Sequence, residues 1–205
     1  MMRFFTIFFA SLVLIGCNGA KQTTADSFKQ PVQNFLNTKG GLCMEMPAKS
    51  LPYQVPYKSM YHSEQYIKSE VLKEMGMLTR KDVEKNNRYD PDLYEYDVSD
   101  EGKVFLKNPG TKYFGFCSGN QKLLSIDNFT EPSDNMGLKV SHVSYTYTYE
   151  NVEELFMKKI NDGVKRIATN FNKEYPETIE IPGQERSKSV FVSTDKGWME
   201  ESFLK

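Results

Sequence analysis

Residues 138–171, LKVSHVSYTYTYENVEELFMKKINDGVKRIATNF, decide the fold class. Their first part alternates between apolar and polar side chains, which predicts a strand from Leu138 to Tyr149. Their second part repeats apolar side chains at helical spacing, which predicts an amphipathic helix that starts at Asn151 and Glu154. The apolar stripe of this helix comprises Val152, Phe156, Ile160, Val164, Ile167 and Phe171.

Before this unit, the chain is expected to form two strands and a loop. Residues 112–117 and 121–129 have strand character and flank a turn at residues 118–120. Residues 131–135, EPSDN, have the composition of a loop.

After it, residues 189–194 and 197–203 predict a β-hairpin, because Asp195-Lys196-Gly197 is a strong turn signal. Strands, one helix and again strands with short connections predict an α+β fold. In this fold an antiparallel sheet carries the long helix on one face, and a smaller helical segment precedes the sheet.

The smaller helical segment occupies the first half of the chain. Residues 63–75 predict a helix that starts at Ser63 and ends at Gly76. Thr79 with Asp82 forms a second helix-start signal of the capping type. Residues 31–37 predict a short helix, because proline suits a first helical turn.

The first seventeen residues indicate where the protein lies. Arg3 precedes an apolar run over residues 4–15, and the run closes with the quartet Leu14-Ile15-Gly16-Cys17. This quartet resembles the lipobox of bacterial lipoproteins. The resemblance implies that residues 1–16 are a signal peptide removed after Gly16, that diacylglycerol is transferred to the Cys17 sulfur, and that the new amino group is acylated, for example with palmitate.

Two other interpretations of this segment are weaker. A transmembrane helix needs about 20 apolar residues, more than this run supplies, and a simple secretory signal would be cut at an A-x-A-like site. Three acyl chains would hold the protein firmly at a membrane, since each buried CH₂ contributes about 0.8 kcal/mol. Asn18 stands where an aspartate would retain a lipoprotein in the inner membrane, which favours the outer membrane, with the domain in the periplasm or at the surface.

Residues 17–30 are polar and are expected to form the lipidated N-terminus and a flexible tether. Residues 31–205 are long enough for one globular domain with a sizeable core, and a subdivision into 31–110 and 111–205 stays open. The 26 basic and 27 acidic residues nearly cancel. This near-neutral balance gives no electrostatic case for nucleic-acid binding, which needs a clustered basic face.

With Cys17 committed to lipid, Cys43 and Cys117 remain. Two thiols in an oxidising envelope predict a disulfide. Its loop of about 75 residues would stabilise the fold by roughly 4 kcal/mol in the chain-entropy model. We expect this bond to tie the segment after the tether to the first strand of the later sheet.

A second, shorter resemblance covers residues 63–106. A helix, an apolar turn at Met77-Leu78, and a strand at 94–98 that turns through 99–102 into 103–106 resemble the helix and wing of winged-helix proteins. The resemblance implies a shared scaffold. Because winged-helix proteins bind DNA, which an exported lipoprotein does not meet, no nucleic-acid partner is expected.

Gly115-Phe116-Cys117-Ser118-Gly119 resembles the nucleophile elbow of α/β-hydrolases, with cysteine in place of serine. That motif requires a strand-turn-helix context, whereas strand-turn-strand is expected here, with the Cys117 thiol consumed in a disulfide. A periplasmic hydrolase that uses Cys117, or a serine with His142, is the alternative function. Neither His62 nor His142 has a ligand-spaced partner, so no metal or cofactor is expected.

The tyrosine stripe of the long strand, Tyr145, Tyr147 and Tyr149, allows two interpretations. It is core if the long helix covers it. It is a binding surface if it faces water, with Tyr53 and Tyr57 nearby. The sequence as a whole predicts a non-enzymatic, membrane-anchored envelope lipoprotein that binds a protein partner or a cell-wall component, which includes an inhibitor or immunity role.

Overall fold

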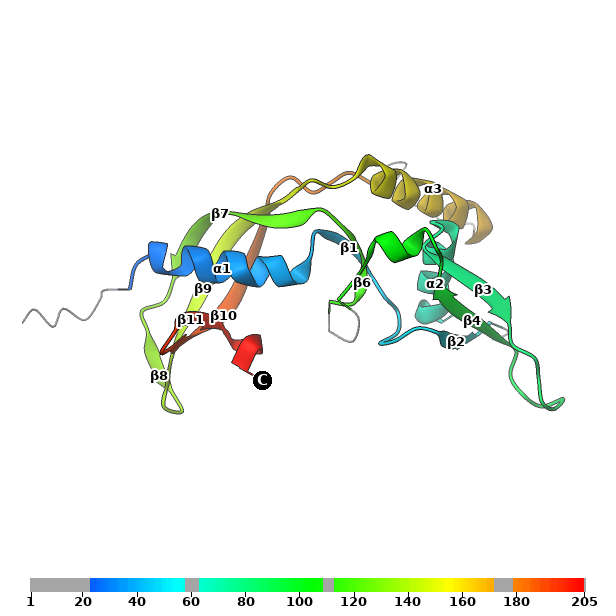
Figure 1. The fold of residues 1–205 in the computed structure, drawn as a ribbon, viewed down its shortest axis with the longest axis horizontal. Helices are drawn as coiled ribbons and strands as arrows, with labels where there is room; N and C mark the ends of the chain where they lie inside the picture. Colours follow the sequence, from blue (N-terminus) through cyan, green and yellow to red (C-terminus); the bar gives the residue numbers. More distant parts are fainter. Residues whose placement is uncertain (1–22, 58–62, 109–112, 172–178, 205) are drawn as a thin grey trace, which may run out of the picture.

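A computed structural model describes residues 23–57, 63–108, 113–171 and 179–204 (Figure 1). The helices in these ranges are α1 (Asp26–Lys39), α2 (Glu64–Glu74), α3 (Glu154–Phe171) and the short 3₁₀ helices η1 (Gly102–Val104) and η2 (Glu201–Leu204). The strands in the first half are β1 (Leu42–Glu45), β2 (Tyr53–Pro56), β3 (Leu78–Asp82), β4 (Leu93–Val98) and β5 (Leu106–Lys107). The later strands are β6 (Gly115–Ser118), β7 (Asn120–Phe129), β8 (Ser133–Asn135), β9 (Leu138–Glu150), β10 (Glu185–Thr194) and β11 (Gly197–Glu200).

The described strands form three sheets in which neighbouring strands run antiparallel. The largest has the order β11-β10-β9-β7, with β8 paired to the N-terminal end of β9. A second sheet has the order β2-β4-β3, and a third has the order β1-β6-β5. Helices and antiparallel sheets in one chain confirm the α+β class.

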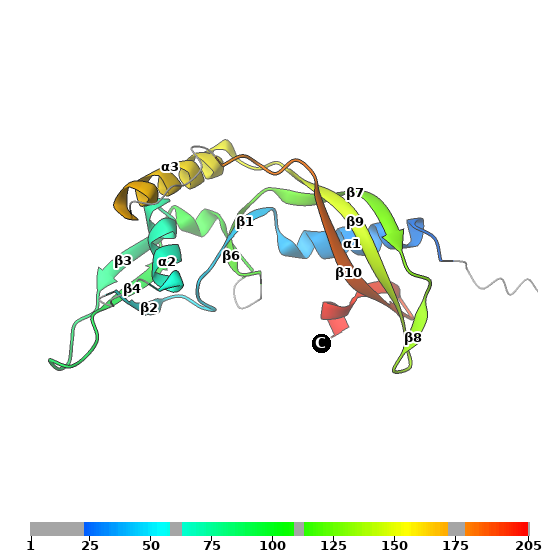
Figure 2. The ribbon, with the colours of Figure 1, turned by 180° about the vertical axis from the view of Figure 1, so that it is seen from behind.

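Two hydrophobic cores lie at opposite ends of an elongated molecule (Figures 1 and 2). We call the first the sheet core, in which α1 lies against the five-stranded sheet. Its buried members are Phe28, Val32, Leu36, Val143, Tyr145, Tyr147 and Phe191. We call the second the helical core, in which α2 and α3 pack on each other and on the sheet of β2, β4 and β3. Its fully buried members include Val55, Leu72, Met77, Tyr96, Phe156 and Ile160.

The helix that covers the large sheet is α1, not the long helix α3 as expected. Phe28, Val32 and Leu36 recur every four residues along α1 and are fully buried against the tyrosine face of β9. The predicted stripe of α3 is buried, as Phe156 and Ile160 show, but it packs on α2 in the other core. Periodicity identified the apolar faces correctly and could not assign their partners, because both helices offer a stripe of the same kind.

Helix α1 also begins earlier than expected, at Asp26 rather than Pro31, so residues 26–30 are helical and not part of a tether. The extra turn contains Phe28, whose ring lies 4.9 Å from Trp198 and 5.3 Å from Phe129, measured between centroids. Burial of this ring stabilises the additional turn, and the helix continues through Pro31.

The first half contains one confirmed helix and two corrections. Ser63 caps α2 as predicted, and its Oγ accepts a hydrogen bond from the Tyr66 N–H at 3.1 Å. Residues 78–82 are strand β3 and not a helix start, because β4 pairs with them along their whole length. β4 also pairs with β2 on its other side, so the predicted wing of 94–98 with 103–106 does not form, and residues 102–104 are 3₁₀ helix.

The second half differs from expectation at two points. Residues 133–135, expected as loop, form strand β8 against β9. The hairpin of β10 and β11 is confirmed around Asp195 and Lys196, but residues 201–204 after it are 3₁₀ helix and not strand. Among the described residues, no helix has the length and apolar character needed to cross a bilayer.

Candidate functional site

The two cores meet where β1 pairs with β6, and a disulfide closes this pairing. Cys43 and Cys117 are directly opposite each other in the register, with their Cα atoms 4.0 Å apart and their sulfur atoms bonded. The predicted pairing of these cysteines is therefore confirmed. The bond joins β1 to β6, in a small sheet of its own and not in the large sheet as expected.

Two glycines allow the backbones to approach closely at this junction. A Cβ atom on Gly119, which has φ of 74°, would lie 2.3 Å from the carbonyl oxygen of Glu150. A Cβ atom on Gly41 would lie 2.0 Å from the carbonyl oxygen of Ser118. Because no side chain fits at either position, glycine lets the chain turn from β6 into β7 and lets β1 lie against β6.

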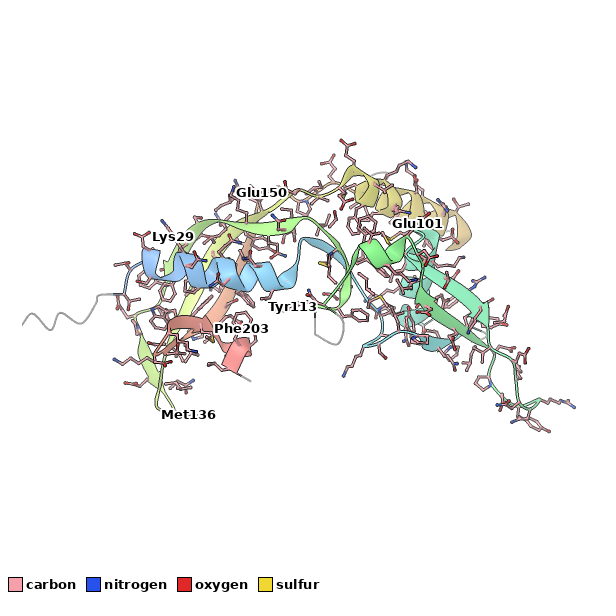
Figure 3. The ribbon with its side chains drawn as sticks, in the orientation of Figure 1. Lys29, Glu101, Tyr113, Met136, Glu150 and Phe203 are labelled. Atoms are coloured by element: carbon pink, nitrogen blue, oxygen red, sulfur yellow. A yellow bond between two sulfur atoms is a disulfide. The ribbon has the colours of Figure 1, made fainter. Side chains whose placement is uncertain are left out.

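A cavity of about 240 Å³ opens beside the disulfide, and we call it the junction pocket. Residues 41–43 form part of its lining, and they include Cys43 of the disulfide. Its other lining residues are Lys39, Glu45, Tyr113, Phe114, Gln121 and Tyr149. Tyr113 lies between the C-terminal end of α1 and β6, on the inner side of the molecule (Figure 3).

Gln121 is the most unusual member of this lining. It lies on β7 directly opposite Tyr149 of β9, and only 7% of its surface is exposed. Its carboxamide oxygen Oε1 is buried and has no hydrogen-bond partner among the described residues. A buried polar atom without a partner costs about 1–3 kcal/mol, so this oxygen lowers the stability of the fold.

The two charges of the pocket are also unpaired within the described part of the chain. The Lys39 ammonium lies 4.4 Å from the centroid of the Phe35 ring and 6.0 Å from that of Tyr113, and forms no ion pair there. Glu45 ends β1 as an exposed residue, and its carboxylate has neither an ion pair nor a hydrogen bond in the described ranges. The lining of the pocket thus includes an ammonium, a carboxylate and aromatic rings, together with Gln121, whose carboxamide oxygen is itself buried.

The other pockets lack this character. A pocket of about 280 Å³ between α2 and α3 is rich in charge, but its charged groups neutralise one another. The pairs are Lys73–Glu74, Arg166–Glu74, Lys158–Asp162 and Lys159–Glu101. Glu101 lies below α3 in Figure 3. A wider depression of about 470 Å³ lies between α1 and the turn at Lys196, beside Trp198, and no buried unpaired side-chain atom lies in its described lining.

The predicted binding tyrosines divide into core and pocket. Tyr145 is fully buried and Tyr147 is 8% exposed, so these two are core and do not form an exposed aromatic surface. Tyr149 is half-buried and lines the junction pocket, and burial raises the pKa of its hydroxyl. The cover of this face is α1, not the helix that was expected to provide it.

The residues of the hydrolase alternative are not brought together. Cys117 is 2% exposed and bonded to Cys43, so it offers no thiolate, and it sits in a strand-turn-strand context. His142 is an exposed residue of β9, eight positions from Glu150, which corresponds to about 26 Å along the strand from the junction. Cys17 and His62 lie outside the described residues. The described ranges contain no group of three or more His, Cys, Asp or Glu side chains able to hold a metal ion.

Sequence reasoning missed Gln121, Lys39 and Glu45. A signal for Gln121 existed, since alternation places it on the same face of its strand as Leu123, whose register partner is Tyr147. A lone polar residue at an apolar position is informative only once its partners are known.

Comparisons of the chain with protein families, with curated proteins and with solved structures found no match in any of the three.

Proposed function

We propose that this protein is a lipoprotein of the bacterial envelope, anchored by acyl chains on Cys17, that binds an envelope protein or a cell-wall component and performs no catalysis. An inhibitor or immunity role falls within this proposal. The observation that carries it is the quartet Leu14-Ile15-Gly16-Cys17 at the end of a short apolar run. The proposed site is the outer membrane, with the folded part in the periplasm or at the surface.

The Cys43–Cys117 bond supports an exported location. Disulfides persist in oxidising compartments such as the periplasm and are rare in the reducing cytosol. This bond is nearly buried on the Cys117 side and joins paired strands, which is typical of a structural disulfide and not of a redox-active one.

The short distance from the anchor to the fold supports a role close to the membrane. Cys17 precedes the start of α1 at Asp26 by nine residues, which span at most about 30 Å when fully extended. The sheet core would therefore stay within about that distance of the lipid, and partners would be membrane-proximal. The resemblance of residues 63–106 to winged-helix proteins enters this proposal as scaffold only, without a DNA-binding role.

Mass spectrometry of the protein purified from its own host tests the location. The expected polypeptide begins at Cys17 and carries the added mass of three acyl chains, and Cys17→Ala yields a protein without lipid mass. Cys43→Ala is the matched control, because it removes a cysteine and leaves the lipid mass unchanged. A polypeptide that begins elsewhere, or begins at Cys17 without lipid, contradicts the proposal.

Crosslinking in intact cells tests the binding role. A discrete envelope partner, protein or glycan, is expected to be captured by the wild type. A hydrolytic activity that is lost in His142→Ala while the fold is retained would instead favour the hydrolase alternative.

A further inference from the structure

We propose that the turn between β8 and β9 inserts its apolar side chains, Met136 and Leu138, into the lipid bilayer that holds the acyl chains of Cys17. We call residues 134–139 the hairpin tip. This inference rests on the proposed lipid anchor and adds a second membrane contact, made by the folded part of the protein.

The hairpin tip exposes apolar side chains that no described residue covers. Met136 is 100% exposed, more than any other large hydrophobic residue in the described ranges, and Leu138 is 49% exposed. A Cβ atom built on Gly137, between them, would meet nothing within 4 Å. Transfer of such apolar surface from water into lipid is favourable, so a bilayer would stabilise what the fold leaves in water.

The geometry of the turn does not explain the methionine. Asn135 and Leu138 are paired, and Met136 and Gly137 between them have φ values of 51° and 82°, as in a type I′ turn. The first position of such a turn favours Asn, Asp or Gly. Because the Met136 side chain is fully exposed, its packing in the fold does not offset this conformational cost, whereas contact with lipid would.

The hairpin tip extends beyond the rest of the large sheet. The pairing of β9 with β10 ends at Val140, opposite Val192. Met136 lies four residues further, which corresponds to about 13 Å along the strand. In Figure 3 the Met136 label marks the outer extremity of this hairpin. The tip can therefore reach a flat surface before the sheet does.

The hairpin tip lies at the end of the molecule where α1 begins (Figures 1 and 2). Phe28, in the first turn of α1, has its ring centroid 5.3 Å from that of Phe129 at the end of β7. Phe129 pairs with Val143 of β9, seven residues or about 23 Å along the strand from Met136. The start of α1 and the tip are thus neighbours on the scale of the molecule.

The length of the chain before α1 places this end at the membrane. Cys17 precedes Thr23, the first described residue, by six residues, which span at most about 20 Å when fully extended. This reach is comparable to the separation of the tip from the start of α1. Acyl chains on Cys17 therefore bring the tip within reach of the same bilayer surface.

The charges of the hairpin tip cancel. Asp134 of β8 is directly opposite Lys139 of β9. A tip without net charge is not attracted to anionic headgroups, so its attachment depends on apolar burial. Salt, which screens charges, should leave it unchanged.

The test is fluorescence of the mature lipoprotein reconstituted into vesicles of zwitterionic phosphatidylcholine. Met136→Cys carries an environment-sensitive nitrobenzoxadiazole label, and the lipid contains a spin-labelled quencher in its acyl chains. The label is expected to shift to shorter wavelength and to lose at least half of its emission to the quencher. Tyr89→Cys is the matched control, because it is 90% exposed and lies between β3 and β4 at the other end of the molecule, and neither change is expected there.

A second labelling site leaves the native methionine in place. A label on Asn135→Cys is expected to be quenched, and adding Met136→Asn should reduce this quenching at least twofold. Tm should not fall, because Asn suits the turn position. Tyr89→Asn, which removes an exposed side chain at the other end, should leave the quenching at position 135 unchanged.

The outcomes separate this inference from the anchor, since acyl mass is measured on the same preparation. Lipidated protein whose tip label is not quenched, is quenched no more than the label at position 89, or loses its quenching at high salt overturns the inference alone. Crosslinking of the tip to a protein in place of lipid quenching overturns it as well. Protein without acyl mass overturns the anchor and this inference together.

Discussion

Gln33 of α1 closes the outer edge of β7 at Gln121. Its Nε2 donates to the carbonyl oxygen of Gln121 at 3.0 Å, and its Oε1 accepts from the backbone N–H of Leu123 at 2.9 Å. The side-chain amide thus makes the two hydrogen bonds that a neighbouring strand would make. Unpaired strand edges promote association with other chains, so this contact protects β7 at the end next to the junction pocket.

Replacement of Gln33 should therefore weaken the fold and expose the edge. We expect Gln33→Ala to lower the free energy of unfolding by about 1–3 kcal/mol, since two backbone groups of β7 lose their partners and the exposed bond to Asn37 is lost as well. Urea unfolding measures the loss, and light scattering at rising protein concentration measures association. Gln30→Ala removes only an exposed side-chain bond to Asn34 and should change neither result.

Loss of the disulfide should destabilise the protein equally from either side. Cys43→Ser, Cys117→Ser and the double variant are each expected to lose about 4 kcal/mol, because the bond closes a loop across a separation of 74 residues. Chemical unfolding of the wild type with and without reductant provides the same comparison. Unequal losses from the two single variants would show that one of the cysteines has a further role.

Glu70 holds a buried polar cluster in the helical core. Its carboxylate accepts from the Tyr96 hydroxyl at 2.8 Å and from Arg80 Nη1 at 2.9 Å and 3.0 Å, and Lys73 lies 3.2 Å away. We expect Glu70→Ala to cost roughly 3 kcal/mol, the low end for a broken buried pair, because Arg80 is partly exposed. Equilibrium unfolding checks the value. Glu64→Ala, which breaks the exposed pair with Lys68 on the same helix, should have no measurable effect.

Alkaline pH should weaken the folded state through its buried tyrosines. Burial raises the pKa of Tyr53 to about 12, and burial also raises the pKa values of Tyr96 and Tyr147. The unfolded chain releases these protons near pH 10, while the folded protein keeps them, so the free energy of unfolding falls as pH rises from about 10 towards 12. Unfolding curves at pH 9, 10 and 11 measure the fall, and it should be shallower in Tyr53→Phe. A stability independent of pH over this interval contradicts the assignment.

Features that depend on neighbouring residues were predictable from the sequence. The Ser63 cap, the buried stripe of α3 and the turn at Asp195 and Lys196 each depend on a few adjacent side chains. The disulfide was predictable because the resemblance at Cys17 left only two cysteines.

Features that depend on distant partners were not predictable. Residues 78–82 carry a helix-start pattern, yet pairing with β4 makes them a strand. Val32 and Ile160 both belong to apolar helix faces, and nothing local assigns the first to the sheet core and the second to the helical core. The junction pocket was missed for the same reason, because Lys39, Gln121 and Tyr149 come together only when α1 lies beside β7.

The path of the chain between the two cores bears on how the protein acquires its structure. The backbone passes from one core to the other four times: after α1, after β6, after β9 and before β10. Phe28 packs in the same core as Phe191, and Val55 packs in the same core as Phe156. A chain synthesised from its N-terminus therefore cannot complete either core until most of its residues have been made. Such non-local topologies fold slowly. Neither half, cut at residue 110, contains a complete set of packing partners, so neither fragment is expected to fold alone.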